Sequence, residues 1–320
     1  MKRLPILGIT DVYPEDFVER FRPYVRELRY RPDINASDAS EWISDVEVWL
    51  MNSRLLVTKD LLASAQDVKL ILRSGVGLDH IDMEAAALQN IQVKTAAGAN
   101  AQAVAEMAVG LLLNLLRSIH IADAEVRQFV WKREANRGHQ LSDMTVGIIG
   151  YGHTGRAFAN TLKGFGCKVM AYDKYVYGFG NDAVQECRLE DLYSEVDVIS
   201  FHVPLNDETL HYGNAAFFAR FHSLKYVLNL SRGGVVNTAD VLQALQSGTL
   251  RGAGLDVLEQ EDFRKLSDTE KELYSSLFAR KDILFTPHIG GWTFSAQEAI
   301  HARMFSEFMT WLPEYQRQHG

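Results

Sequence analysis

The stretch that decides the fold is VGIIGYGHTG, at residues 146–155. Its apolar residues lead into three glycines, Gly150, Gly152 and Gly155, and a helical pattern follows at residues 156–164. This order predicts a buried parallel strand, a tight turn and a helix. The first glycine permits the turn, the second lets the backbone approach a ligand, and the third lets helix and strand pack closely. Because N–H groups at a helix start favour an anion, the stretch predicts a pyrophosphate site.

The next predicted strand, residues 168–172, supplies a second signal. It runs into Asp173, which lies 18 residues after Gly155. A carboxylate at this place accepts hydrogen bonds from the ribose hydroxyls of NAD and repels the 2′-phosphate of NADP. The sequence therefore predicts NAD, with a purely structural turn at Asp173 as the alternative. Lys174 is a neighbouring cation that would offset part of the repulsion of the phosphate.

Strand-like and helical patterns alternate along the whole chain, which predicts an α/β fold with parallel sheets. The predicted strands are residues 6–9, 46–51, 69–72 and 91–94, then 146–150, 168–172, 196–201, 226–229, 252–256 and 283–285, and helices are predicted at 15–24, 59–65 and 83–88 in the first part. We expect two Rossmann-like doubly wound domains, with the dinucleotide-binding domain inserted in a smaller, flavodoxin-like substrate domain. The expected boundaries are 101–290 for the first and 1–100 with 291–320 for the second, since a last helix at 295–311 is expected to return.

Composition excludes several classes of function. The net charge is −8 and no basic block is present, which argues against nucleic acid or an anionic membrane as partner. The longest apolar run, residues 108–116, is about half a membrane span and predicts a buried helix. The two cysteines, Cys167 and Cys187, have neither metal-site nor disulfide spacing. We therefore expect no metal and a cytoplasmic protein, because the N-terminal apolar run is also too short for a signal peptide.

Residues 101–118 form a long apolar pattern that predicts a helix, and the segment up to residue 142 is expected to continue as helix or arm. That segment mixes aromatic and charged residues, including Phe129, Trp131 and Lys132. The alternatives are a helix that packs inside its own domain and an arm that joins two subunits, and the mixture favours the arm.

Three polar segments follow the last predicted strands, where ligands bind in open α/β sheets. Arg232 carries a planar fork that grips a carboxylate. His288 is an acid or base near neutral pH, and a nearby carboxylate, Glu261 or Glu259, would favour its protonated form. Together they fit the reduction of a 2-keto acid by NADH. Taken singly, each has a plain alternative: a surface turn at Arg232, a loop histidine, and solvated glutamates.

At this point the chain resembles the D-isomer-specific 2-hydroxyacid dehydrogenase family. The matching segments are LRSGVGLDHID at 72–82, TAAGANAQAVAEMAVGLLL at 95–113, VGIIGYGHTGRAFA at 146–159, HVPLNDETLH at 202–211, NLSRGGVVNT at 229–238, GAGLDVLEQE at 252–261 and TPHIGG at 286–291. The resemblance implies an NAD(H)-dependent enzyme for a small 2-keto or 2-hydroxy acid, a cleft that closes on binding, and a homodimer built through residues 101–145.

The resemblance also implies roles for single residues. Arg232, Glu261 and His288 would be the catalytic set, and Gly75, Val76 and Gly77 would bind the substrate carboxylate with Arg232. Ser53 lies where family members vary with substrate. Besides the three glycines, the residues expected at the cofactor are Val104, His153, Thr154, Asp173, His202, Val203, Pro204, Leu230, Ser231, Asp256, Gly290 and Gly291, with Asp256 near the carboxamide.

Two departures from the family pattern stand out. Asp262 follows Glu261 where the family usually has proline, and residues 262–282 form a longer and more charged connection. That connection is expected to be a loop that covers the site or changes partner contacts. Arg54 or Arg73 would meet a second anionic group such as phosphate, unless they are structural. The alternative function is a non-catalytic, NAD-sensing corepressor-like protein; a methyltransferase of the same fold class is a more distant one.

Overall fold

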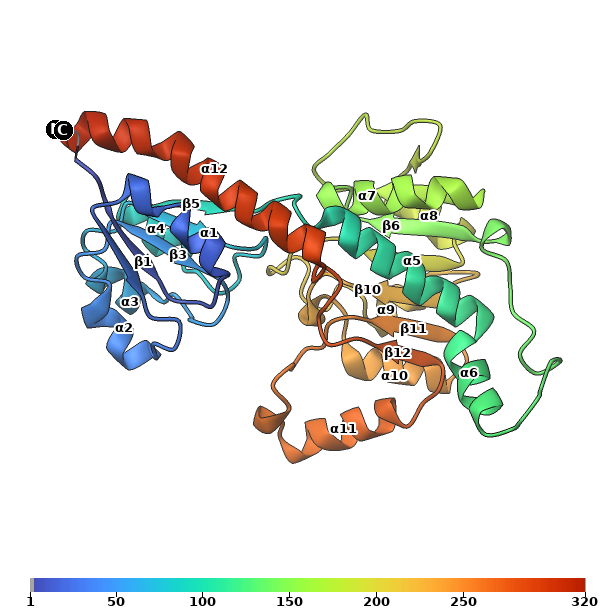
Figure 1. The fold of residues 1–320 in the computed structure, drawn as a ribbon. Coiled ribbons are helices and arrows are strands. Elements are labelled where there is room, and N and C mark those ends of the chain that lie inside the picture. Colours follow the sequence, from blue (N-terminus) through green and yellow to red (C-terminus); the bar gives the residue numbers. More distant parts are fainter. Residues whose placement is uncertain (1–2, 320) are drawn as a thin grey trace. The chain divides into compact units, whose positions relative to one another are not determined.

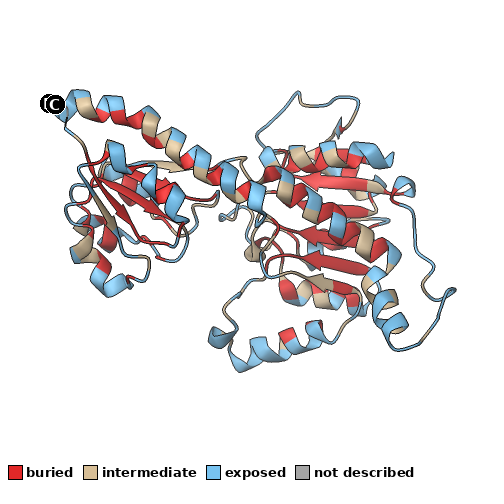
Figure 2. Ribbon diagram, in the orientation of Figure 1, coloured by how far each residue is buried: buried red, intermediate tan, exposed pale blue. Residues whose placement is uncertain are grey.

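The structure is a computed structural model that describes residues 3–319. The chain divides into two compact units, one formed by the chain up to Asn100 together with the segment from Phe294, the other by Ala101–Thr293. The second crossing between the units thus lies three residues beyond the expected boundary at 290. In both units the central strands are buried, and most exposed residues lie on the edge strands, helices and loops (Figure 2).

The first unit contains a five-stranded parallel sheet with the order β2-β1-β3-β4-β5 (Figure 1). Its elements are β1 (Ile6–Ile9), α1 (Glu15–Glu19), β2 (Glu27–Tyr30), α2 (Ala36–Trp42), β3 (Val48–Met51), α3 (Lys59–Ser64), β4 (Leu70–Arg73), α4 (Met83–Leu88), β5 (Gln92–Thr95) and α12 (Phe294–His319). This is the flavodoxin-like order of a doubly wound sheet. Neither β2 nor α2 was predicted. Strand β2 is a short edge strand without a buried residue and shows no apolar pattern, and α2 buries only Ala39.

Side chains alternate between the two faces of this sheet, as the pleat of a strand requires. Leu7 and Ile9 pack with α1 and α12, whereas Trp49 and Met51 pack with the helices α2, α3 and α4. Helix α12 was expected to end at residue 311 but continues to His319 through Pro313. Its last turns are held because Leu312 and Tyr315 are buried.

Tyr315 contacts a buried carboxylate, that of Glu47. Glu47 is 4% exposed, and its Oε1 accepts from the Tyr315 hydroxyl at 2.5 Å and from Arg3 at 2.7 Å. Its Oε2 accepts from the Ile6 N–H at 2.9 Å and from Arg26 at 3.0 Å. Glu47 therefore joins α12 to β1 and to the start of β3.

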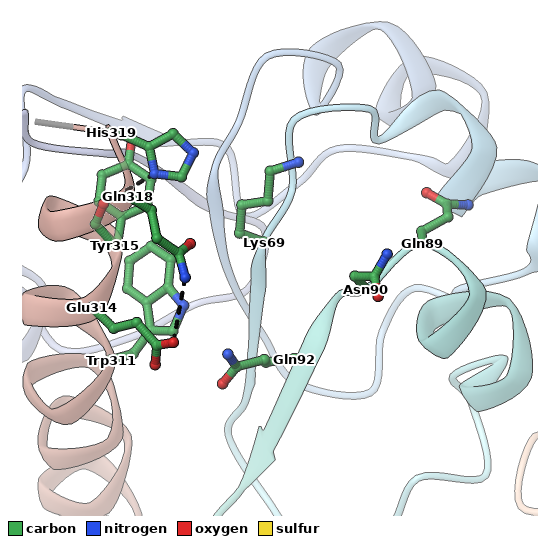
Figure 3. A pocket seen from close by; sticks show the side chains of 9 residues that line it. All are labelled: Lys69, Gln89, Asn90, Gln92, Trp311, Glu314, Tyr315, Gln318 and His319. Atoms are coloured by element: carbon green, nitrogen blue, oxygen red, sulfur yellow. Dashed lines mark hydrogen bonds between the residues drawn. The ribbon is translucent and has the colours of Figure 1, made fainter.

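A polar pocket of about 360 Å³ lies beside the end of α12, at the amino ends of β4 and β5. Lys69 precedes β4, Gln92 begins β5, and the aromatic rings of Trp311 and Tyr315 belong to α12 (Figure 3). Since ligands of doubly wound sheets bind at the carboxyl ends of the strands, this pocket lies at the opposite edge from the expected substrate residues.

The second unit contains a seven-stranded parallel sheet with the order β12-β11-β10-β9-β6-β7-β8 (Figure 1). Its elements are α5 (Ala101–Arg117), α6 (Ile119–Arg127), β6 (Thr145–Ile149), α7 (His153–Leu162), β7 (Lys168–Tyr172), β8 (Gln185–Glu186), α8 (Leu189–Glu195), β9 (Val198–Phe201), α9 (Ala215–Phe218), β10 (Tyr226–Asn229), α10 (Thr238–Gln246), β11 (Gly252–Leu255), α11 (Asp268–Phe278) and β12 (Ile283–Phe285). The six predicted strands are present, and the two-residue β8 is an addition at the edge.

Helices cover both faces of this second sheet. The apolar residues of α5 and α7 pack on one face of the strands, and those of α9, α10 and α11 pack on the other. The strand order places β9 next to β6, which makes the point between them the switch point of a dinucleotide-binding sheet. Helix α7 begins at His153, three residues before the expected start, so the glycine turn leads directly into it.

The segment between α5 and β6 is only partly helical. Helix α6 ends at Arg127, and residues 128–140 contain no helix or strand. Phe129 is fully exposed with a positive φ of 60°, and Trp131 is 79% exposed. Within residues 3–319 no single helix is long and apolar enough to cross a membrane; α5 and α6 pass that test only as a pair bent by 62°.

Residues 262–282 were expected to form a loop. Instead they contain a helical turn at Phe263–Lys265 and the helix α11. Ser267 accepts from the Glu270 N–H at 3.3 Å and Glu270 accepts from the Ser267 N–H at 2.8 Å, which is a capping box. A serine followed three residues later by a glutamate is a readable helix start. The charge of the segment hid this signal, because only Tyr274 and Leu277 of α11 are buried.

Candidate active site

The glycine turn has the geometry that a pyrophosphate requires. Gly150 has a φ of +94°, and a Cβ there would lie 2.6 Å from the carbonyl oxygen of His202. A Cβ on Gly155 would lie 2.1 Å from the carbonyl oxygen of Gly150. By contrast Gly152, the N-cap residue of α7, faces open space. The turn therefore needs two of its glycines for packing and keeps the third open at a helix N-terminus, which fits a bound dinucleotide.

Asp173 has a structural role, and its expected contact with the ribose stays a prediction. Its carboxylate accepts three backbone N–H groups, from Tyr151 at 2.6 Å, Tyr175 at 2.8 Å and Val176 at 2.9 Å. It thereby connects the glycine turn to the end of β7. A carboxylate has about four acceptor sites, so capacity for a ribose hydroxyl remains.

Lys174 does not face an open anion site. Its Nζ lies 2.7 Å from Glu208 Oε1, and the second carboxylate oxygen of Glu208 accepts from the hydroxyl of Tyr175. The ion pair holds the pKa of Glu208 below its usual range, because Lys174 and Tyr175 both donate to it. The cation beside Asp173 is therefore already compensated.

Among the expected cofactor residues, His202, Val104 and Leu230 have their side chains in the core. The ring of His202 is buried, with Nε2 2.8 Å from Ser200 Oγ, and burial lowers its pKa to about 3. Val104 is 6% exposed and belongs to the core under α5. The imidazole of His202 is thus a neutral core group, so a ligand contact at this position would use the backbone.

A buried asparagine shapes the turn that carries Arg232. Asn229 is 1% exposed; its Oδ1 accepts from the N–H and hydroxyl of Ser231 at 3.1 and 2.8 Å, and its Nδ2 donates to the Arg232 carbonyl at 2.9 Å. A Cβ on Gly233 would lie 1.9 Å from the carbonyl oxygen of Leu258. The Arg232 turn therefore packs directly on the segment that leads to Glu261.

Glu261 and His288 are in contact, although 27 residues separate them in the chain. His288 Nδ1 lies 3.0 Å from Glu261 Oε2. Since a carboxylate only accepts, Nδ1 carries the hydrogen and Nε2 is the ring nitrogen that faces away from the glutamate. Both side chains are about 45% exposed and thus accessible to a ligand. Of the two glutamates considered, Glu261 is the one that meets His288.

Glu259 has different partners. Its Oε2 lies 2.7 Å from His211 Nε2, and its Oε1 accepts from the Thr238 N–H at 2.7 Å. His211 has a φ of 51°, which is uncommon outside glycine. Glu259 therefore belongs to a second His–Glu pair at the start of α10, which spacing alone did not reveal.

Asp256 holds the segment that carries His288. Its buried carboxylate accepts from the Thr286 hydroxyl at 2.5 Å and from the N–H groups of Ile289 and Gly290 at 2.9 and 2.8 Å. His288 itself has a φ of 55°, and its N–H donates to the Asp256 carbonyl at 2.8 Å. A strained backbone conformation persists only where surrounding contacts hold it in place, and at His288 the contacts with Asp256 do so. A contact between Asp256 and the carboxamide stays a prediction.

In the first unit, the expected substrate residues follow β3 and β4. Gly75 leaves room for the buried Arg73 side chain, since a Cβ there would lie 1.3 Å from the Arg73 guanidinium in its present position. Val76 is 38% exposed and Ser53 is exposed. Arg54 donates to the carbonyls of Ile34 at 2.5 Å and Thr10 at 2.7 Å. Arg54 is therefore a structural residue, as the plain alternative held.

Comparison with known proteins places this chain in a family. Residues 109–290 match the model of the D-isomer specific 2-hydroxyacid dehydrogenase NAD-binding domain. The chain is 34% identical to a hydroxypyruvate reductase of Thermotoga maritima over 258 residues, which cover 81% of this chain and 82% of that enzyme. It is 32% identical to a D-3-phosphoglycerate dehydrogenase of Mycobacterium bovis over 92% of this chain, but spans only 54% of that enzyme's length.

A solved structure agrees. D-2-hydroxyisocaproate dehydrogenase superposes with a TM-score of 0.79 at 25% identity, covering 98% of this chain and 97% of that one. The second unit is thus a dinucleotide-binding domain by both fold and sequence. The chain belongs to the D-isomer-specific 2-hydroxyacid dehydrogenase family and is an NAD-binding oxidoreductase.

Proposed function

We propose that the protein reduces a 2-keto acid to the D-2-hydroxy acid with NADH. The observation that carries this proposal is the contact between His288 and Glu261, at the carboxyl ends of β11 and β12. Arg232 follows the neighbouring strand β10, so three groups suited to keto-acid chemistry share one edge of the sheet. The proposal also assigns substrate binding to residues of the first unit, as the family resemblance implies: Gly75, Val76, Gly77 and Ser53.

Each residue has a role in this proposal. The Arg232 guanidinium binds the substrate carboxylate and polarises the keto oxygen. Glu261 accepts from Nδ1 of His288, which orients the ring and stabilises the imidazolium, and Nε2 delivers its proton to the keto oxygen. NADH, when bound, supplies the hydride for C2. The keto acid, NADH and one proton thereby give the 2-hydroxy acid and NAD⁺.

A substrate panel tests the reaction class. The purified chain is incubated with NADH and glyoxylate, hydroxypyruvate, pyruvate, 3-phosphohydroxypyruvate or keto acids with larger side chains, and NADH absorbance is followed. We expect at least one of these acids to be reduced. The proposal fails if NADH binds, as shown by its fluorescence, while none of the acids is turned over.

The carboxylate of Asp173 leads to a separate prediction, which concerns the choice between NADH and NADPH. We expect kcat/KM to be higher with NADH than with NADPH, because the carboxylate repels the 2′-phosphate and Lys174 is compensated by Glu208. Asp173→Asn should lower the ratio of kcat/KM with NADH to kcat/KM with NADPH. Glu208→Gln, which frees Lys174, should lower the same ratio by a smaller factor. A wild-type enzyme that prefers NADPH would contradict the assignment.

We also propose that residues 101–145 form the interface of a homodimer. Phe129 and Trp131 lie exposed on the segment after α6, and large exposed apolar side chains are typical of protein interfaces. The double variant Phe129→Ser/Trp131→Ser should dissociate to monomers in analytical ultracentrifugation. A matched variant, Tyr175→Ser/Tyr177→Ser, replaces equally exposed aromatic residues after β7 and should leave the mass unchanged.

A further inference from the structure

A pocket of about 570 Å³ opens beside the Glu261–His288 pair, within the second unit. The pair forms part of one wall. The rest of the lining is mainly apolar, and Phe263 and Phe278 come from the unusually long segment 262–282. A volume of this size is typical of small-molecule sites, which are mostly apolar with a few polar groups.

The aromatic wall is built by helix α11. Phe278 packs edge-to-face on Phe285 of β12, with 5.0 Å between ring centroids, and lies against Tyr274 at 5.7 Å. Phe263 contacts Phe278 at 5.8 Å. Nevertheless Phe263 and Phe278 remain 51% and 45% exposed. The rings are therefore held in place by packing while leaving apolar surface uncovered at the pocket.

The charges around the pocket favour a neutral occupant over an anionic one. Among the described residues that line it, none is a lysine or arginine, and Glu261 contributes a carboxylate. The nearest cations of the long segment are bound elsewhere: Arg264 contacts Asp262 at 2.7 Å, and Lys265 lies 3.7 Å from the same carboxylate. Among the described lining residues, His288 could pair with a phosphate or second carboxylate, but the proposed mechanism uses it at the keto oxygen. A neutral apolar group would instead meet the phenylalanine rings.

The pocket is also contiguous with the Arg232 turn. Its lining residue Leu258 is the one whose carbonyl lies against Gly233, directly after Arg232. Because His288 itself lines the pocket, a keto acid that accepts the proton of His288 would border the apolar wall.

We propose that this pocket binds the substrate side chain, and that the enzyme acts on 2-keto acids with a bulky apolar side chain, such as a benzyl or isobutyl group. The inference rests on the proposed function and goes beyond it, because it selects apolar keto acids over glyoxylate, hydroxypyruvate and phosphorylated acids. It also assigns a function to the long segment between Glu261 and His288: Phe263 and Phe278 determine specificity.

The test compares kcat/KM for phenylpyruvate and 4-methyl-2-oxopentanoate with kcat/KM for glyoxylate and 3-phosphohydroxypyruvate, all with NADH and the full chain. We expect the two apolar acids to be preferred. In Phe278→Ala, and separately in Phe263→Ala, the ratio of kcat/KM for phenylpyruvate to that for glyoxylate should fall by about 10- to 200-fold. Phe165→Ala, at a half-exposed phenylalanine after α7, is the matched control and should keep the wild-type ratio.

The outcomes separate the two proposals. Efficient reduction of glyoxylate or 3-phosphohydroxypyruvate in preference to the apolar acids overturns the pocket assignment and leaves the reaction class intact. The pocket assignment is also overturned if the ratio of kcat/KM for phenylpyruvate to that for glyoxylate stays at the wild-type value in both Phe278→Ala and Phe263→Ala. Failure of the wild-type enzyme to reduce any keto acid, with NADH bound, overturns the proposed function itself.

Discussion

Replacing His288 with glutamine is expected to lower kcat for keto-acid reduction by about 10²- to 10⁴-fold. Glutamine keeps a polar side chain but cannot deliver the proton that the keto oxygen needs. NADH binding, followed by fluorescence, should be retained, because the glycine turn and Asp173 lie on other strands. The control is His222→Gln, since that histidine is exposed and its contact with Tyr193 uses only the backbone N–H.

The same variant separates the enzyme from an NAD-sensing protein of the same fold. If turnover of the best keto acid survives in His288→Gln, the acid lies elsewhere and the catalytic assignment is wrong. Glu261→Gln should lower kcat for keto-acid reduction while NADH binding is retained, because an amide orients and stabilises the imidazolium less well than a carboxylate does. A glutamate without a role at His288 would leave kcat unchanged.

Replacing Glu47 with alanine is expected to cost the first unit about 2–6 kcal/mol of unfolding free energy. The change leaves the Tyr315 hydroxyl and the Ile6 N–H buried without an acceptor, at about 1–3 kcal/mol each. Arg3 and Arg26 contribute less to this loss, because both are nearly half exposed and regain water. Urea unfolding followed by tryptophan fluorescence measures the effect, and Glu19→Ala, in an exposed ion pair with Arg22, is the control.

The stability supplied by Glu47 should also depend on pH. Burial raises the pKa of its carboxyl, but hydrogen bonds from Tyr315, Ile6 and Arg26 outweigh burial and hold the pKa below its usual range. A lowered pKa means that the stabilisation is present above the unfolded-state pKa of about 4.3 and is lost as the pH falls through the folded value. Glu47→Gln should therefore flatten the acid limb of the stability curve. An unchanged acid limb would show that other carboxylates dominate it.

Much of the fold was predictable because its signals are local. Strand β7 was predicted with its observed bounds, since Lys168–Tyr172 is a short apolar run between turn signals. Strand β2 was missed, because an edge strand such as Glu27–Tyr30 buries little and carries no apolar period. Helix α11 was taken for a loop although its capping box is legible, because its exposed face is charged and its buried residues are few.

The candidate site divides in the same way. Glycine spacing and residue types alone indicated a dinucleotide turn, Asp173, Arg232 and His288, because each of these follows a strand. Spacing did not distinguish Glu261 from Glu259; the tertiary structure did, by placing Glu261 against His288 and Glu259 against His211. The tertiary structure also shows that the imidazole of His202 lies in the core beside Ser200. It shows that the carboxylate of Asp256 accepts hydrogen bonds from the segment that carries His288.

The sequence by itself therefore determined the α/β architecture, the glycine turn and the family, since these depend on patterns that neighbouring residues carry. Only the tertiary structure decided which carboxylate meets the histidine and that an apolar pocket lies beside them. Those features join residues that are distant in the chain, 27 positions apart for Glu261 and His288. The distances between them are set by strand order and by the packing of α11 on β12. Spacing along the chain contains no information about such distances.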